Sequence, residues 1–447
     1  MTIPLRDVAG AIGSEAPPGE ALISGWSVDS RTIGAGDLFF ALRGPNHDGH
    51  RFVREALEKG AAAAVVDQPV EAPGKLLRVA DTLEALQSAA LRARRQWRGE
   101  VVAVTGSAGK TTAKEVIARM LETEMTVGKS IGNLNNHIGV PLSILRLPSE
   151  ARVAVVEIGM NHAGEIRRLA RVARPTVGVV TNAGYAHMEF FGSLEEVALA
   201  KRELIESLPE GGTAVLNADD PQVIRFRDAH RGPVITFGLS ADADVRAEDV
   251  AYRPDGVRFR CGGSTWFESP LLGRHGVLNL LTGLAVARVF GIAPERLREA
   301  ARSTAAGKMR GERFTHAGIT VFDDCYNSNP EAVRSMLDVL RATAARRKHA
   351  VLGEMLELGR WSESLHRDVG LYAASCGINV LIGIRGAALH MVDEAVRAGL
   401  PDSAAYFFED PAAAGEFARR LAREGDAVLF KGSRGTHVEK ALESFLK

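Results

Sequence analysis

The sequence has little cysteine, no long apolar run and no excess of charge of either sign. Its three cysteines are too few and too scattered for a disulfide framework or a cysteine-based zinc site, which favours a reducing compartment. No apolar stretch is long enough to span a membrane, and the start of the chain lacks the basic and apolar segments of an export signal. Lys and Arg number 55 and Asp and Glu also number 55, so the chain has no net positive charge that would attract nucleic acid. We therefore expect a cytoplasmic protein without membrane insertion or nucleic-acid binding.

The composition is that of a folded protein with several domains. Hydrophobic residues make up 46% and charged residues 25%, close to the averages for globular domains. At roughly 150 residues per domain, 447 residues correspond to about three domains. Changes of pattern along the chain predict domains over residues 1–80, 81–309 and 310–447.

Short β-branched runs alternate with helical stretches through most of the chain. The first domain is expected to be a small α/β unit. In the second, continuous apolar strands separated by helices predict a parallel sheet covered on both faces. The last domain restarts the alternation with ITVFDD, HAVLGEM, NVLIGI and DAVLFKG, but it lacks a GxGxxG dinucleotide fingerprint. We expect an α/β protein of three domains, the last of them Rossmann-like.

The clearest chemical signal is a glycine-rich turn between a predicted strand and a predicted helix, in VVAVTGSAGKTTAKE. Glycines let the backbone approach phosphate closely, and amide groups at a helix N-terminus stabilise its negative charge. Lys110 is placed to reach the outer phosphates and Thr111 to bind Mg²⁺. Val104 stands where the usual P-loop has its first glycine, so this P-loop is a shortened one. The segment predicts ATP or GTP binding by Gly106, Ser107, Ala108, Gly109, Lys110, Thr111 and Thr112.

Polar residues end or follow the next two predicted strands, at the sheet edge where such folds bind ligands. Glu157 interrupts an apolar run, and a buried carboxylate is costly unless it is paired or bound to a metal. His187, taken alone, is more typical of a structural histidine, because imidazole is an unusual partner for Mg²⁺. Lys201, by composition alone, is a surface lysine. Its ammonium beside Mg²⁺ would be repelled unless CO₂ converted the amine into an anionic carbamate.

A series of motifs over nearly the whole chain resembles the Mur ligases of peptidoglycan synthesis. In chain order these motifs are GSAGKTT, EIGMNHAGE, TNAGYAHMEFFGS, AKRE, NADDP, GRHGVLNLLTGLA, MRGER, DDCYNSNP and KGSRG. DDCYNSNP and NLNNHIGVPL are most similar to the family member that joins D-alanyl-D-alanine to UDP-N-acetylmuramoyl-tripeptide (UDP-MurNAc-tripeptide). The DNPR-type acceptor motif of the member that adds the third amino acid is not found.

The resemblance implies an ATP-dependent ligase that first converts a carboxylate into an acyl phosphate and then lets an amine attack it. It implies two Mg²⁺ ions bound by Thr111, Glu157, His187 and a carbamylated Lys201. The catalytic residues it implies are Lys110, Lys201, His187 and Arg310.

The same resemblance implies further contacts with ATP. Asn279 corresponds to an asparagine that contacts adenine, whereas Gly276 stands where the family usually has another asparagine. Arg310 corresponds to an arginine on the γ-phosphate, although the residues alone favour a surface ion pair with a nearby Glu. Asp324 corresponds to a ribose-binding carboxylate, with Tyr326 beside it.

The substrate-binding residues have ordinary structural readings as well. The segments around Asp29 and Asp48 resemble the UDP-binding domain of the family, but they are also typical of ordinary turns. The loop amides of Asn135 and Asn136 are often turn-formers. Basic residues such as Lys431 and Arg434, near the end of the chain, are often surface charges. The expected substrate-binding residues are Ser30, Arg31, Asn135, Asn136, Lys431 and Arg434.

Three other functions stay open at this point. The member that adds the third amino acid would use a single amino acid as acceptor. A folylpolyglutamate ligase shares the nucleotide core and reaction type but lacks the first domain indicated by VDSRTIGAGDLFFALRG. A GTP-binding switch protein would need an NKxD-type motif, and none is found. We expect a monomer whose partners are UDP-MurNAc-tripeptide and D-alanyl-D-alanine.

Overall fold

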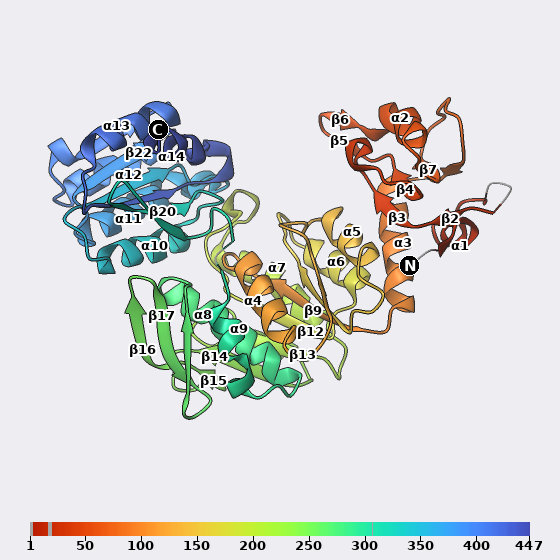
Figure 1. Cartoon of the computed structure of the whole chain (residues 1–447), viewed down its shortest axis with the longest axis horizontal. Helices are drawn as coiled ribbons and strands as arrows, with labels where there is room; N and C mark the ends of the chain where they lie inside the picture. Colours follow the sequence, from red (N-terminus) through yellow and green to blue (C-terminus); the bar gives the residue numbers. More distant parts are fainter. Residues whose placement is uncertain (1–2, 17–19, 306) are drawn as a thin grey trace.

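The computed structural model describes residues 3–16, 20–305 and 307–447. Residue 306, shortly before the predicted boundary after residue 309, lies outside the described residues. Figure 1 shows three α/β regions, with the first and the C-terminal region on opposite sides and the central region between them. The three-domain α/β class is confirmed, while the boundaries after residues 80 and 309 stay predictions. Within the described ranges, no helix has both the length and the apolar character needed to cross a membrane.

The first region is built on a parallel sheet whose apolar strands are buried, as in Phe39 and Phe40. In sheet order its strands are β3 (Gly25–Ser27), β4 (Asp37–Phe40), β7 (Ala63–Val66) and β8 (Leu76–Arg78). Its helices are α1 (Leu5–Ala11) and α2 (Val53–Glu58), and two small pairs are formed by β1 (Ile3–Pro4) with β2 (Leu22–Ile23) and β5 (Arg43–Gly44) with β6 (His47–Asp48). Helix α3 (Thr82–Gln96) leads to the central region. Asp81 caps its start, and the Asp81 carboxylate accepts a hydrogen bond from the Glu84 N–H at 2.8 Å.

The central region contains a parallel seven-stranded sheet covered on both faces, as predicted. In sheet order its strands are β10 (Val127–Lys129), β11 (Val153–Glu157), β9 (Glu100–Thr105), β12 (Val177–Val180), β13 (Thr213–Asn217), β14 (Val234–Gly238) and β15 (Val245–Arg246). One face is covered by α4 (Lys110–Leu121) and α8 (Gly273–Val289), the other by α5 (Gly139–Leu145), α6 (Glu165–Ala173) and α7 (Leu194–Glu206). An antiparallel sheet of β16 (Glu248–Arg253), β17 (Gly256–Cys261) and β18 (Thr265–Ser269) packs beside α8, and α9 (Arg298–Arg302) follows.

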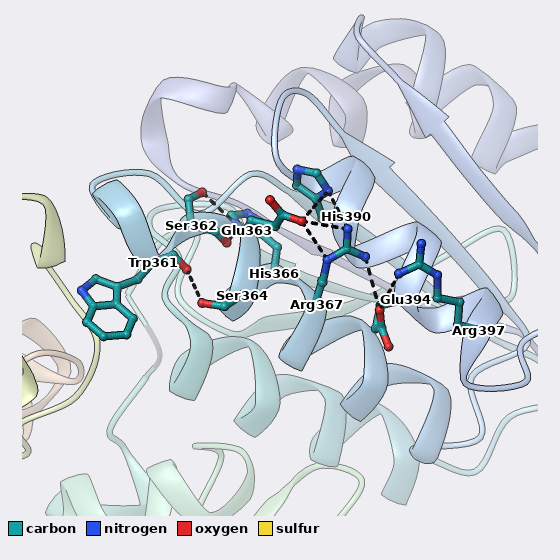
Figure 2. A network of polar contacts seen from close by, with 9 residues as sticks. All are labelled: Trp361, Ser362, Glu363, Ser364, His366, Arg367, His390, Glu394 and Arg397. Carbon is teal, nitrogen blue, oxygen red and sulfur yellow. Dashed lines mark hydrogen bonds and ion pairs between the residues drawn. The ribbon is translucent and has the colours of Figure 1, made fainter.

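The C-terminal region has a six-stranded sheet that is parallel except at one edge. In sheet order its strands are the antiparallel β19 (Glu312–His316), β20 (Ile319–Asp324), β24 (Ala427–Lys431), β21 (Lys348–Gly353), β22 (Val380–Ile384) and β23 (Ala405–Phe408). Its helices are α10 (Pro330–Ala342), α11 (Ser362–Ser375), α12 (Ala388–Arg397), α13 (Pro411–Leu421) and α14 (Val438–Phe445). Arg367 of α11 joins Glu363 on its own helix and Glu394 on α12, so an ion-pair network ties these two helices together (Figure 2).

Candidate active site

The candidate site lies at the carboxyl edge of the central sheet. Strand β9 lies between β11 and β12, and the chain leaves these neighbouring strands toward helices on opposite faces, which opens a crevice at this edge. A cavity of about 470 Å³ occupies the position, with residues of α8 and of the C-terminal region closing its other side. Of the predicted nucleotide-binding residues, all except Gly106 line it: Ser107, Ala108, Gly109, Lys110, Thr111, Thr112, Asn279, Arg310, Asp324 and Tyr326.

The P-loop packs so closely on its surroundings that glycine is required at two positions. A Cβ atom on Gly106 would overlap the Oγ1 atom of Thr181 at the end of β12. Gly109 has φ 80°, which disfavours other residues, and a Cβ atom there would lie 2.9 Å from Oδ1 of Asn279 on α8. The two glycines therefore let the loop turn tightly before α4 begins at Lys110.

The residues after β12 hold the P-loop in place. The Ala108 N–H donates to Oδ1 of Asn182 at 2.8 Å, and the Asn182 amide donates back to the Ala108 carbonyl at 3.1 Å. Ser107 Oγ donates to the carbonyl of Gly184 at 2.8 Å and accepts from its N–H at 2.9 Å. These side-chain bonds hold the loop in its turn before α4.

Lys110 folds back on the P-loop, where its Nζ atom donates to the Gly106 carbonyl at 2.7 Å. Burial lowers the pKa of Lys110, and the carboxylates of Glu157 and Glu357 partly oppose that shift while the positive charge of Arg310 adds to it. Both cations face the same cavity. The cavity is therefore suited to a polyanion.

Thr111 and Glu157 form an oxygen-rich corner of the cavity. Thr111 Oγ1 donates to Glu157 Oε2 at 2.7 Å, and the Asn135 amide donates to Glu157 Oε1 at 2.7 Å. Hydroxyl and carboxylate oxygens are suitable ligands for Mg²⁺, which usually takes few protein ligands and completes its shell with phosphate and water. No cluster of three or more His, Cys, Asp or Glu side chains able to hold a metal occurs in the described residues. This corner fits Mg²⁺ only together with a ligand such as nucleotide.

His187 meets a carboxylate from the C-terminal region. Its Nδ1 atom lies 2.6 Å from Oε2 of Glu357, and both residues have left-handed backbone conformations, with φ values of 60° and 63°. The contact with His187 lowers the pKa of Glu357, burial opposes the shift, and Lys110 adds to the lowering. No sequence pattern pairs these residues, because they lie 170 positions apart.

Lys201 is buried in α7, with 1% of its surface exposed, so the expectation of a surface lysine from composition alone is wrong. Its ammonium makes no hydrogen bond or ion pair with another described side chain. Burial lowers the pKa of Lys201 well below its usual value, and the charge of Lys110 lowers it further while Asp220 opposes the shift. Burial therefore makes this amine easier to deprotonate than that of an exposed lysine.

The C-terminal wall of the cavity begins with Arg310, whose guanidinium stacks 3.8 Å from the ring centroid of Tyr326. Lys431 is buried and donates to Asp324 Oδ2 at 2.6 Å, so it is not a surface charge. Asn329 caps α10 by accepting from the Ala332 N–H at 2.8 Å.

Gly276 does not line the cavity. A Cβ atom there would lie 2.9 Å from the backbone carbon of Leu271, so any side chain would press on that backbone. Asn279, one turn later on α8, does line the cavity. In this chain, close packing against the Leu271 backbone therefore disfavours an asparagine side chain at position 276.

Several predicted substrate residues lie outside this cavity and have local partners. Ser30 Oγ donates to Glu55 at 3.4 Å, and Arg31 pairs with Asp29 at 2.6 Å. Asn136 Oδ1 accepts from the Gly139 N–H at 2.8 Å and shapes the start of α5. Asn135 and Lys431 line the cavity. Arg434, three residues after Lys431, is exposed and does not line it. The cavity is also lined by residues for which the sequence had suggested no role, including Asn133, Asn182, Arg274, His275, Glu331 and Ser335.

Comparison with known families agrees with this geometry. Three domain profiles match the chain: "Mur ligase family, catalytic domain" over residues 22–118, "Mur ligase middle domain" over 104–287 and "Mur ligase, glutamate ligase domain" over 309–434. The chain belongs to the Mur ligase family. This Mur ligase is 33% identical over 437 residues to the UDP-N-acetylmuramoyl-tripeptide--D-alanyl-D-alanine ligase of Bacillus subtilis, covering 96% of the chain and 94% of the relative.

Solved structures give the same relationship. A crystal structure of MurF from Acinetobacter baumannii superposes with a TM-score of 0.93 at 29% identity, covering 100% of this Mur ligase and 99% of that chain. MurF from Thermotoga maritima in complex with ADP superposes with a TM-score of 0.84 at 28% identity, covering 94% and 96% of the two chains. The similarity therefore includes all three regions of the Mur ligase.

Proposed function

We propose that this enzyme uses ATP to join D-alanyl-D-alanine to UDP-MurNAc-tripeptide, releasing ADP and phosphate. The observation that carries the proposal is the single cavity in which the P-loop, the Thr111–Glu157 corner and the Arg310–Tyr326 wall face one another. The near full-length similarity to ligases of this name supports the choice of substrates.

A carboxylate must be activated before an amine attacks it, because its charge repels the nucleophile and its oxygens leave poorly. In the first step, an oxygen of the tripeptide's terminal carboxylate bonds to the γ-phosphorus of ATP, and the bond from that phosphorus to the bridging oxygen breaks, releasing ADP. In the second step, the dipeptide amine bonds to the acyl carbon and loses a proton, and phosphate leaves.

The chain's own residues contribute charge and position to these steps. Lys110 and Arg310 face the phosphates and offset the repulsion between them and the substrate carboxylate. The N–H groups at the start of α4 bind phosphate oxygens. Thr111 would hold a first Mg²⁺, which when bound neutralises charge on the phosphate oxygens. Preorganisation of the P-loop by Asn182 lowers the cost of ordering it on binding.

We propose that a second Mg²⁺ is held by Glu157, His187 and Lys201 after carbamylation of that lysine. The neutral amine of Lys201 bonds to the carbon of CO₂ and releases one proton, which gives an anionic, oxygen-bearing side chain. Its burial, the depressed pKa and the absence of a partner among the described residues support this conversion. An unmodified ammonium there would oppose metal binding.

The remaining assignments belong to the same proposal. Asn279 is placed at adenine, and Asp324 with Tyr326 at ribose. Ser30 and Arg31 of a first domain over residues 1–80 bind the UDP part, while Asn135, Asn136, Lys431 and Arg434 bind the peptide substrates. The enzyme is a cytoplasmic monomer with further domains over residues 81–309 and 310–447.

Phosphate release from ATP with purified UDP-MurNAc-tripeptide tests the function. Sustained release should require D-alanyl-D-alanine and should yield the pentapeptide product by mass spectrometry. Release that depends on a single third amino acid with a dipeptide substrate, or on glutamate with a folate, would contradict the proposal and favour the respective alternative ligase.

A further inference from the structure

Lys114 lies three residues after Thr111 on α4, and its side chain is fully buried. Its Nζ atom donates to the carbonyl of Ser130 at 2.7 Å and to the carbonyl of Gly132 at 2.8 Å. It also lies 3.0 Å from Oε1 of Glu115. A buried ammonium is costly unless hydrogen bonds replace its water, and these three oxygens match its three N–H groups. The lysine therefore holds the two carbonyls in one fixed arrangement.

The two carbonyls belong to the 130–138 loop, which joins β10 to α5 and is neither helix nor strand. Asn133 and Asn135, further along the same loop, line the active-site cavity. A segment without a regular ladder of backbone hydrogen bonds depends on side chains for its conformation. Lys114 thus fixes the first part of a loop whose second part faces the reaction centre.

The same loop holds Glu157 at the end of β11. Ser130 Oγ accepts from the Glu157 N–H at 3.2 Å, and the Asn135 amide donates to Glu157 Oε1 at 2.7 Å. The Asn135 carbonyl accepts from the Gly159 N–H at 2.8 Å, which fixes the asparagine itself. The other carboxylate oxygen, Oε2, accepts from Thr111 on α4. The carboxylate is therefore held between the loop and α4, the two segments that Lys114 joins.

We propose that Lys114 is a positioning residue for the reaction: by tying the 130–138 loop to α4, it sets the direction in which Glu157 presents its oxygens to Mg²⁺. This role rests on the proposed function, in which Glu157 binds the second Mg²⁺. Lys114 does not line the cavity, so it acts through Ser130 and Asn135 and not by touching a substrate.

The geometry that Mg²⁺ demands makes the orientation of this carboxylate important. A carboxylate that binds Mg²⁺ has to place its oxygen at a short distance in a nearly octahedral arrangement, so a small rotation is costly. Without the Lys114 ammonium, the carbonyls of Ser130 and Gly132 lose their donor and the loop is free to shift. Asn135 would then turn Glu157 Oε1 away from its place. Groups that orient a metal ligand typically change metal affinity or activity by about 10- to 100-fold.

The test measures Mn²⁺ binding to the full-length enzyme by electron paramagnetic resonance, with a non-hydrolysable ATP analogue present. Glu157→Gln identifies the ion that uses Glu157. In Lys114→Met, which keeps an apolar chain but no N–H group, this ion should bind about tenfold or more weakly, and kcat for pentapeptide formation should fall similarly. The KM for ATP should stay within about twofold. Lys129→Met is the matched control, because it removes an exposed lysine that bonds to the same Glu115 at 2.7 Å, and it should leave all values unchanged.

Two further variants separate positioning from a general loss of folding. Adding Lys114→Met to Asn135→Ala should weaken Mn²⁺ binding by no more than about threefold beyond the worse single variant, because both act on one carboxylate. Lys114→Gln keeps an amide donor and should retain part of the affinity, and it carries the test if Lys114→Met does not fold.

Three results would overturn the proposal: unchanged binding of the Glu157-dependent ion in the Lys114 variants, equal weakening of the nucleotide and of every ion, or no ion that depends on Glu157. If the metal results are as expected but the wild type forms no pentapeptide, the proposed function fails and the role of Lys114 at the metal site stands.

Discussion

Lys431 Nζ lies 2.6 Å from Oδ2 of Asp324 and joins the ends of the neighbouring strands β24 and β20. A second bond, to the carbonyl of Asn327 at 2.9 Å, fixes the segment that follows β20. The lysine is buried and lines the cavity, so its charge faces the cavity and not bulk solvent. It positions the carboxylate that we place at the ribose.

Replacement Lys431→Met should therefore weaken ATP binding. Asp324 would lose its partner and add uncompensated negative charge beside the nucleotide, so the Kd for ATP should rise about tenfold, and stability should fall by about 3 kcal/mol. Calorimetric titration and denaturant unfolding measure the two effects. Lys440→Met, at an exposed position of α14, is the control. Unchanged ATP affinity with reduced stability would limit the pair to a structural role.

Gly106→Ala should abolish ATP binding, because the added methyl group overlaps Thr181 Oγ1 and pushes the P-loop away from β12. Gly10→Ala is the control: it places the same methyl group in open space on α1, where it should raise stability by about 0.5–1 kcal/mol. Fluorescent-nucleotide binding and thermal melting test both variants. Normal affinity in Gly106→Ala would show that the loop tolerates a shift at this point.

Lys201→Ala should lose most activity, at least about 100-fold, because the proposed carbamate oxygen disappears from the metal site. Short carboxylic acids such as acetate should restore part of the activity by supplying that oxygen. Lys201→Arg keeps the charge but does not react with CO₂, and it should be as inactive as the alanine variant without rescue. Full activity in either variant would contradict the carbamate.

Stability in acid should depend on Asp426, which is buried immediately before β24 and pairs with Arg347 at 2.8 Å. Burial raises its pKa, but the bonds from Arg347 and the Arg423 N–H outweigh that effect and lower it below 3.8. A lowered pKa adds stability above about pH 4 that is lost as pH falls through the folded-state pKa. Asp426→Asn should flatten the decline of Tm below pH 4; an unchanged slope would contradict this assignment.

Local sequence was sufficient to predict the parts of the site that lie within one strand–turn–helix unit. The VVAVT run, the two glycines and Lys110 specify β9, the P-loop and α4 by strand pattern, backbone freedom and helix-end electrostatics. Asp81 and Asn329 likewise cap the starts of α3 and α10 through side chains that lie within one segment of sequence.

Contacts between distant segments could not be predicted in this way. Asn182 holds the P-loop only because β12 lies next to β9, and Glu357 reaches His187 only because the C-terminal region packs against the central one. Composition predicted an exposed Lys201, but this lysine is buried, because residue spacing along α7 does not reveal which face of the helix is buried. At Gly276 the motif alone suggested a missing adenine contact, whereas the structure shows that this position packs against the backbone of Leu271.

The most direct test of the central claim follows one oxygen atom. UDP-MurNAc-tripeptide labelled with ¹⁸O in its terminal carboxylate is incubated with the enzyme, ATP, Mg²⁺ and D-alanyl-D-alanine, and the released phosphate is analysed by mass spectrometry. Activation through an acyl phosphate predicts one ¹⁸O atom in each phosphate released, because the oxygen that attacks phosphorus leaves with it. Unlabelled phosphate alongside pentapeptide product would contradict phosphoryl transfer to the carboxylate.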